Sequence, residues 1–266
     1  MRYITKLTVA ATLAVSAISV ATSANALVFA TFGPTTDERI VWNRQDTGTN
    51  QNLKNGVLFT SSVKAFQPNS AQFTPVKTVF NFLANSPFGN LAGMTGLSTD
   101  FSLFGTETGQ AVQVAGTNLT QANVNGTFKF VYTGPSFLNA NNVLVATGAN
   151  LLSGSFANAR ITGVKLASTA SFGAQDPAQT VTFQSDFINF ASAQGETINL
   201  NFFNVLKPFG QGNVTNRALP DFRAEVGGQF SVASIPEPGT WALMIMGFGG
   251  AGAMLRSNRR RALALA

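Results

Sequence analysis

The sequence contains neither cysteine nor histidine among its 266 residues. The lack of cysteine excludes disulfides, thiolate metal sites and cysteine nucleophiles within this chain. The lack of histidine excludes Ser-His-Asp triads and histidine metal ligands. A domain built from these residues must therefore be held together by its hydrophobic core.

Charged residues are also scarce, at 11% of the chain. The formal net charge of +6 at first suggests a nucleic-acid binder. Most of the excess positive charge, however, lies at the two ends of the chain, which carry six of the 17 Lys and Arg. Between Leu27 and Ile235 there are eleven Lys and Arg against ten Asp and Glu, which leaves a net charge of +1. We expect no nucleic-acid partner, because no basic stripe is present to neutralise phosphates.

No window between Leu27 and Ser234 shows a sustained helical period. This segment is rich in Phe, Thr, Asn, Ser, Gly and Val, and poor in Glu, Lys and Leu. That composition favours strands and turns over helices. The 24 Phe of the chain argue against disorder, because disordered segments lack large apolar side chains to bury.

Apolar and polar residues instead alternate with a period of two, which is typical of strands with one buried and one wet face. The alternation predicts that Phe128, Phe130, Tyr132, Ile198, Leu200 and Phe202 are buried, together with Phe183, Val226, Phe230 and Val232. Further predicted strands cover Val76–Leu83, Leu97–Phe104, Val143–Ala146 and Val181–Phe190.

Turn signals separate these segments, and they include Asn55-Gly56, Asn125-Gly126, Gly134-Pro135, Asp176-Pro177 and Gly210-Gln211-Gly212. Asn-Gly favours tight hairpins because both residues tolerate positive φ angles. Many short strands with frequent turns predict an all-β domain over residues 27–234. We expect an antiparallel β-sandwich of the jelly-roll kind.

The N-terminus has the pattern of a secretory signal peptide over residues 1–26. Arg2 and Lys6 precede the apolar stretch Leu7–Val20, and Ala24-Asn25-Ala26 provides small residues for cleavage. The alternative is a transmembrane anchor, but the apolar stretch is short for one. We therefore expect an exported protein that is cut after Ala26.

Near the C-terminus, Pro236-Glu237-Pro238 precedes the uncharged stretch Trp241–Leu255 and a basic cluster. As a helix, the 15 uncharged residues would span about 22 Å, which is short of the ~30 Å hydrocarbon core. We expect a single transmembrane helix that holds the chain only transiently in the inner membrane. The basic cluster, which favours the cytoplasmic side, consists of Arg256, Arg259, Arg260 and Arg261.

This order of parts resembles the PEP-CTERM sorting signal, in its PEPxxWA variety, of exopolysaccharide-producing Gram-negative bacteria. The resemblance covers Ile235–Arg261 and includes Trp241 and Ala242 after the Pro-Glu-Pro triplet. It implies recognition and cleavage by exosortase, a membrane-embedded cysteine transpeptidase. Residues 262–266 would form a short cytoplasmic tail. The resemblance implies nothing catalytic for the domain before it.

Few residues suggest catalysis. Asp37-Glu38, Asp176 and Asp186 are candidate acids for a glycosidase, but carboxylates on loops are more often surface charge. Trp42 could stack on a sugar if exposed, although a buried Trp is commoner. Gly247–Gly252 matches Gly-x-Gly-x-x-Gly, but it follows no predicted strand and lies inside the apolar stretch. We expect no catalytic residue, no metal site and no cofactor.

Three functions remain open from the sequence. The first, which we favour, is a non-enzymatic protein of the cell surface or extracellular matrix that associates with exopolysaccharide or biofilm. The second is a carbohydrate-binding, or less plausibly carbohydrate-cleaving, domain delivered by the same tail. The third is a subunit that assembles through strand edges. An exposed cleft lined by polar and aromatic side chains would favour the second.

Overall fold

The computed structural model describes residues 26–35, 39–45, 55–63, 73–83, 88, 91, 93–107, 109–175, 179–191, 193–233, 246 and 248. Ala26–Ala233 forms one compact unit, called the β-domain here. Its strands are β1 (Ala26–Phe32), β2 (Ile40–Gln45), β3 (Asn55–Thr60), β4 (Val76–Phe82), β5 (Leu97–Glu107), β6 (Gln113–Ala115), β7 (Asn118–Tyr132), β8 (Phe137–Leu138), β9 (Leu144–Val145), β10 (Asn150–Val164), β11 (Ala170–Gln175), β12 (Thr180–Gln184), β13 (Thr197–Leu206) and β14 (Phe222–Ala233).

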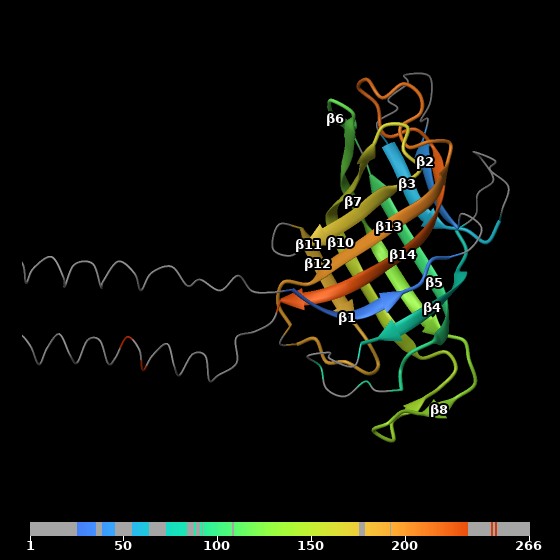
Figure 1. The fold of residues 1–266 in the computed structure, drawn as a ribbon, viewed down its shortest axis with the longest axis vertical. Helices are drawn as coiled ribbons and strands as arrows, with labels where there is room; N and C mark the ends of the chain where they lie inside the picture. Colours follow the sequence, from blue (N-terminus) through green and yellow to red (C-terminus); the bar gives the residue numbers. More distant parts are fainter. Residues whose placement is uncertain are drawn as a thin grey trace, which may run out of the picture. The chain divides into compact units, whose positions relative to one another are not determined.

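The β-domain is an all-β structure, as the sequence predicts, and every strand pairing is antiparallel. Twelve strands belong to one hydrogen-bonded sheet, while β8 and β9 form a separate two-stranded hairpin. Figure 1 shows this hairpin beyond one end of the large sheet. The fold class is therefore confirmed at the level of an antiparallel all-β domain.

The twelve strands are arranged as eight longer ones, because four pairs of consecutive strands each lie end to end along a neighbouring strand that both members share. β1 and β2 both pair with β14. β3 and β4 both pair with β5, and on their other side β3 pairs with β2 and β4 pairs with β1. In the same way β5 and β6 both pair with β7, and β11 and β12 both pair with β10. Each long strand thus lies beside the one that follows it in the chain.

The sheet closes on itself, because β1 at the start of the domain pairs with β14 at its end. Ala26 lies opposite Ala233, and Phe32 lies opposite Gly228 (Figure 1). The expected sandwich or jelly roll is not confirmed, since the structure has one closed meander in place of two stacked sheets. Alternation along a strand fixes which side is buried, but it does not fix which strands become neighbours.

Asparagine in the left-handed conformation accompanies irregularities in two long strands. Asn123 in β7 has φ 62° and Asn158 in β10 has φ 59°, and the pairing of the two strands shifts register beside both residues. Asn158 N donates to Asn125 Oδ1 at 3.0 Å, which ties the two irregular segments together. Bulges of this kind increase strand bending and twist, so they favour closure of the sheet. Asparagine suits them because it tolerates positive φ better than most residues.

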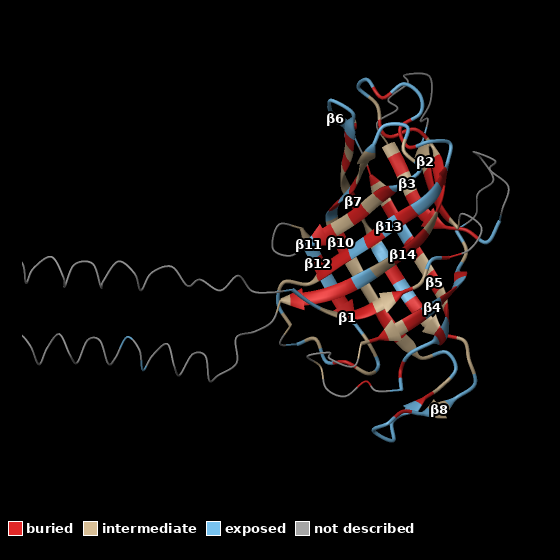
Figure 2. Ribbon diagram, in the orientation of Figure 1, coloured by how far each residue is buried: buried red, intermediate tan, exposed pale blue. Residues whose placement is uncertain are grey.

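The closed sheet encloses a core made largely of phenylalanine. Figure 2 shows buried and exposed residues alternating along the strands, as expected when one face lines the interior. Phe130 lies at the centre, with ring centroids 4.5 Å from Phe101, 4.8 Å from Phe80 and 4.9 Å from Phe32. An eight-stranded closed sheet has an interior just wide enough for side chains to fill.

The predicted core is confirmed. Phe128, Phe130, Tyr132, Phe183, Ile198, Leu200, Phe202, Val226, Phe230 and Val232 are all buried. Trp42 is fully buried as well, and its Nε1–H donates to Leu219 O at 2.9 Å. Trp42 is therefore a core residue, the commoner of the two alternatives, and it does not offer a sugar-stacking surface.

The predictions of hairpin turns at two Asn-Gly pairs are wrong. Asn55-Gly56 opens strand β3 and Asn125-Gly126 lies inside strand β7. Both glycines serve close packing: a Cβ on Gly56 would lie 2.1 Å from Trp42 Cζ2, and one on Gly126 would lie 2.0 Å from Phe104 O. The expected turn at Gly210-Gln211-Gly212 is present, with φ 67° at Gly210 and 124° at Gly212.

Gly126→Ala should therefore destabilise the β-domain by about 1 to 3 kcal/mol, because the new methyl group meets the Phe104 carbonyl, which belongs to the paired backbone of β5. Gly33→Ala is the matched control, since nothing lies within 4 Å of a Cβ placed there. Urea unfolding of both variants measures the difference. Equal stabilities for the two variants would contradict the close-approach explanation.

None of the described residues forms a helix long and apolar enough to cross a membrane. The expected transmembrane helix Trp241–Leu255 lies outside the described residues except for Met246 and Phe248, which are helical and exposed. Its membrane role therefore stays a prediction.

Candidate functional site

Most of the residues that the sequence assigns to sorting and processing lie outside the described residues. These are Ala24, Pro236, Glu237, Pro238, Trp241, Ala242, Arg256, Arg259, Arg260 and Arg261. Ala26, the second small residue of the expected signal-peptide site, is described as the exposed first residue of β1. The predicted cut after Ala26 would therefore leave β1 only one residue shorter.

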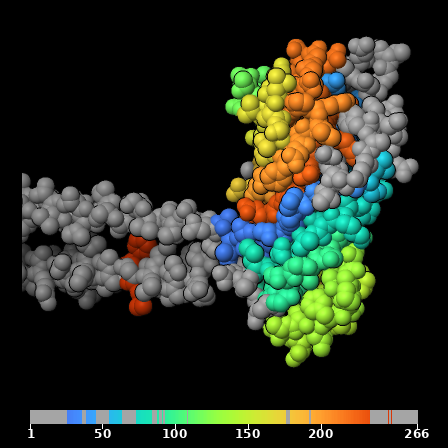
Figure 3. Space-filling model, turned by 45° about the vertical axis from the view of Figure 1, so that its right-hand side comes forward, coloured from blue at the N-terminus to red at the C-terminus, as the bar shows by residue number. Residues whose placement is uncertain are grey.

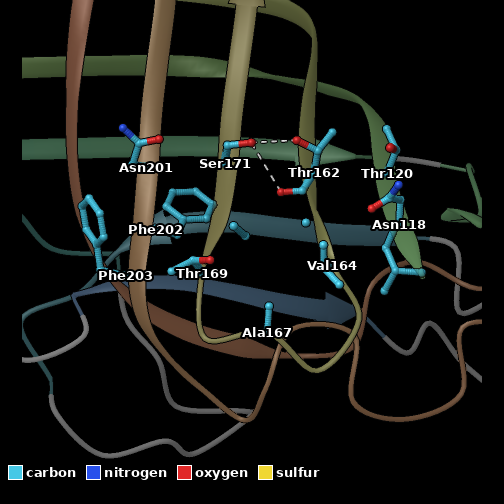
Figure 4. Close-up of a pocket in the computed structure, with 13 residues that line it drawn as sticks. Asn118, Thr120, Thr162, Val164, Ala167, Thr169, Ser171, Asn201, Phe202 and Phe203 are labelled. Carbon is cyan, nitrogen blue, oxygen red and sulfur yellow. Dashed lines mark hydrogen bonds between the residues drawn. The ribbon is translucent and has the colours of Figure 1, made fainter.

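An open hollow of about 580 Å³ lies on the outer face of the β-domain, across β7, β10, β11 and β13. We call it the outer groove. In Figure 3 the yellow residues of β10 and β11 and the orange residues of β13 lie on the same visible face. Figure 4 shows its side chains, which come from these four strands and from the turn between β10 and β11.

One side of the outer groove is a row of polar side chains in register. Thr120 pairs with Thr162, Thr162 with Ser171, and Ser171 with Asn201. Figure 4 shows the four side chains in line across the strands. Thr162 Oγ1 and Ser171 Oγ lie 2.7 Å apart in a hydrogen bond, and Ser171 Oγ also donates to Thr162 O at 3.5 Å.

The other side of the outer groove carries apolar side chains together with the polar Thr169 and Asn118 (Figure 4). Phe203 in β13, which is 38% exposed, and the exposed Val164 at the end of β10 lie there with Ala167 from the following turn (Figure 4). The groove can therefore offer hydroxyl and amide groups along one edge and apolar contact along the other.

A second hollow of about 440 Å³ lies across β5, β7, β10 and β12. Lys129, Ser155 and Thr182 line it, and Ser155 Oγ and Thr182 Oγ1 are hydrogen-bonded at 2.7 Å. Phe73 stands at its rim in an edge-to-face contact with Phe104, with ring centroids 5.6 Å apart. This hollow differs from the outer groove in carrying a lysine.

Among the residues that the structure describes, no carboxylate lines either of these two hollows. Of the acids that the sequence singles out, Asp37, Glu38 and Asp176 lie outside the described residues. Asp186 is described, and its Oδ2 accepts the Asn150 N–H at 2.7 Å, so it holds the segment after β12 against β10. The described residues of these two hollows therefore do not supply the pair of acids that glycoside cleavage needs.

Among the described acids of the β-domain, Glu107 is buried, and sequence reasoning missed it. Glu107, at the end of β5, is 1% exposed. Its Oε1 accepts the Gln110 N–H at 2.7 Å, and its Oε2 has no hydrogen-bond partner among the described residues. Burial raises the pKa of the Glu107 carboxyl to about 7, although the Gln110 hydrogen bond acts in the opposite direction. The alternation of β5 offered a signal, because Glu107 has the same parity as the buried Leu97 and Phe101.

Because the folded pKa of Glu107 lies above the unfolded one, the folded state binds more protons between pH 4.5 and about 7. Proton binding by Glu107 therefore stabilises the folded state. This contribution is complete below pH 4.5 and is lost as the pH rises through about 7. We expect the free energy of unfolding to fall by on the order of 2 to 3 kcal/mol across this range. Glu107→Gln should flatten the profile, and Asp186→Asn serves as a control. A profile unchanged by Glu107→Gln would contradict this account.

The comparisons with known proteins concern the C-terminal region. Residues 234–261 match the PEP-CTERM protein-sorting motif. The match begins directly after β14 ends at Ala233. No curated protein and no solved structure matched the chain. The resemblance to the PEP-CTERM sorting signal over Ile235–Arg261 is thus confirmed. The PEP-CTERM motif is a substrate signal for exosortase processing, so it implies export and a membrane-associated sorting step.

The polar row of the outer groove was missed at the level of sequence. Alternation in β13 does place Asn199 and Asn201 on a wet face. It cannot show that Asn201 lies opposite Ser171, which in turn lies opposite Thr162. That information is carried by strand register, which links residues distant in the chain.

Proposed function

We propose that this chain is an exported, non-enzymatic protein of the cell surface or extracellular matrix. Exosortase would cut it at Pro236-Glu237-Pro238, and the released β-domain would associate with exopolysaccharide. The observation that carries the proposal is the PEP-CTERM match at residues 234–261, which follows the closed β-domain without an intervening segment.

The chemistry of the tail supports transient membrane attachment. Pro236 and Pro238 disfavour helix around Glu237, so this triplet is suited to an extended conformation that a processing enzyme can grip. The uncharged stretch Trp241–Leu255 is only just long enough to be held in a bilayer. The arginines after it favour the cytoplasmic side of the membrane and so delay release.

An epitope placed after Arg261 tests the proposal in the native host and in a host that lacks exosortase. We expect the full-length tagged chain to accumulate in the inner membrane only without exosortase. Persistence of that form at equal levels in both hosts would show that the tail is a simple anchor. Mass spectrometry of the mature protein would identify both termini, including the expected start at Leu27.

Carbohydrate binding is a second candidate for the β-domain. It is favoured by the outer groove, which combines Thr, Ser and Asn side chains with the exposed ring of Phe203. Ligand sites commonly combine apolar or aromatic surface with a few well-placed polar groups. Carbohydrate cleavage is less favoured, because among the described residues the outer groove and the second hollow supply no carboxylate, and a third hollow beside β12 supplies Glu196 alone.

A further inference from the structure

The polar row of the outer groove spans four neighbouring strands. Thr120, Thr162, Ser171 and Asn201 follow one another in register on β7, β10, β11 and β13 (Figure 4). Adjacent strands lie about 4.8 Å apart, so the row extends over about 14 Å. A row of this length can contact several units of an extended polymer.

The polar groups in this row suit a ligand that both donates and accepts hydrogen bonds. A hydroxyl can donate one hydrogen bond and accept others, and the Asn201 side chain carries both an amide donor and a carbonyl acceptor. In the described part of the chain, no Asp, Glu, Lys or Arg side chain lines the groove. The lining therefore provides no fixed charge to pair with an anion or a cation.

The opposite edge supplies apolar contact at the same groove. Phe203 and Val164 are 38% and 47% exposed and lie on either side of the turn between β10 and β11, beside Ala167 (Figure 4). A ligand that fits must therefore have an apolar face and a hydroxyl-bearing edge. Sugar rings have this character, since their C–H groups form the faces and their hydroxyls project from the edges.

We propose that the outer groove binds an uncharged polysaccharide chain that runs across β7, β10, β11 and β13. This inference rests on the surface-protein function proposed above and assigns the contact to particular residues. Sugar hydroxyls exchange hydrogen bonds with Thr120, Thr162, Ser171 and Asn201. One ring packs its C–H face against Phe203.

An extended peptide suits this groove less well. Peptides that bind to sheets commonly add a strand to an unpaired edge. At the outer groove, β10 is paired with β7 and β11, and β11 is paired with β10 and β13. Their backbone groups are therefore already engaged. A peptide would have to bind through side chains alone.

The test measures binding of neutral hexasaccharides to the full-length chain in a sugar-free zwitterionic detergent. The panel is cellohexaose, maltohexaose, mannohexaose and xylohexaose, with hexagalacturonate as the acidic counterpart and an uncharged Gly-Ser-Asn dodecapeptide as the peptide arm. We expect at least one neutral hexasaccharide to bind with a dissociation constant of about 1 mM or below, since the groove is open and shallow. Asn201→Ala and Phe203→Ala should each weaken this binding about fivefold to tenfold.

Two control variants separate the groove from general effects on the sheet. Asn199→Ala changes an exposed asparagine on the same strand and the same face, two residues from Asn201 and outside the groove lining. Leu138→Ala removes a 61% exposed apolar side chain in the β8–β9 hairpin. Neither should alter the affinity. Circular dichroism of every variant checks that the fold is kept.

The proposal is overturned if no neutral hexasaccharide binds at a sugar concentration 10-fold above the expected dissociation constant. It is also overturned if Asn199→Ala weakens binding as much as Asn201→Ala, or if hexagalacturonate or the peptide binds more tightly than every neutral sugar. The exosortase experiment has a separate readout, which is the location of an epitope after Arg261. A protein that is correctly processed but binds no sugar would therefore fail this inference alone.

Discussion

Replacing Pro236, Glu237 and Pro238 together by alanine should abolish C-terminal cleavage and leave the precursor in the inner membrane. The replacement removes both prolines, which disfavour helix around Glu237, so the helix predicted from Trp241 could begin earlier in the chain. It also removes the carboxylate of Glu237, which is the only charge between Glu225 and Arg256. An epitope after Arg261 and membrane fractionation measure the retained form.

The matched control is Pro34→Ala, which changes an exposed proline in the segment between β1 and β2. Its processing should equal that of the unaltered chain. Circular dichroism should show the same strand-rich spectrum for both variants, because the triplet lies outside the β-domain. If the alanine triplet is cleaved at the normal rate, the Pro-Glu-Pro sequence is not what the processing enzyme recognises.

Phe130→Ala should reduce the free energy of unfolding of the β-domain by about 3 to 5 kcal/mol. The ring of Phe130 is fully buried and lies within 6.3 Å, centroid to centroid, of five other phenylalanine rings. Its removal leaves a cavity at the centre of the closed sheet. The surrounding rings belong to different strands, and each is fixed by its own backbone pairing, so they can fill that cavity only in part.

Phe104→Ala is the control for Phe130→Ala, because Phe104 lies on β5 with its side chain 40% exposed. We expect a loss of about 1 kcal/mol or less at this position. Urea unfolding of the mature protein gives both values. Similar losses for the two variants would show that the interior of the sheet is assigned wrongly.

Sequence reasoning worked best where alternation was regular. Phe128 and Phe130 in β7, and Leu200 and Phe202 in β13, follow a strict period of two and are all buried. It missed β10, the 15-residue strand Asn150–Val164. Small residues occupy several of its positions, and the irregularity at Asn158 breaks the alternation. When a bulge interrupts the alternation of apolar and polar residues, the pattern no longer predicts one continuous strand.

The hairpin turns predicted at the two Asn-Gly pairs are wrong for a different reason. Local chemistry gives Asn55-Gly56 and Asn125-Gly126 the residues of a tight turn. In the structure, Gly56 gives room to the ring of Trp42, and Gly126 gives room to the backbone of β5. Neither neighbour is close in sequence to its glycine. The close approach of distant segments therefore outweighed a local preference.

The sequence by itself determined the class of the fold, the buried faces of the regular strands and the sorting motif at residues 234–261. These features depend on residues within one short segment, where spacing and side-chain chemistry act locally. Only the tertiary structure decided that β1 pairs with β14 to close the sheet, that Glu107 is buried, and that Thr162, Ser171 and Asn201 lie in one row. Each of these depends on register between segments far apart in the chain, which is set by the packing of the whole core.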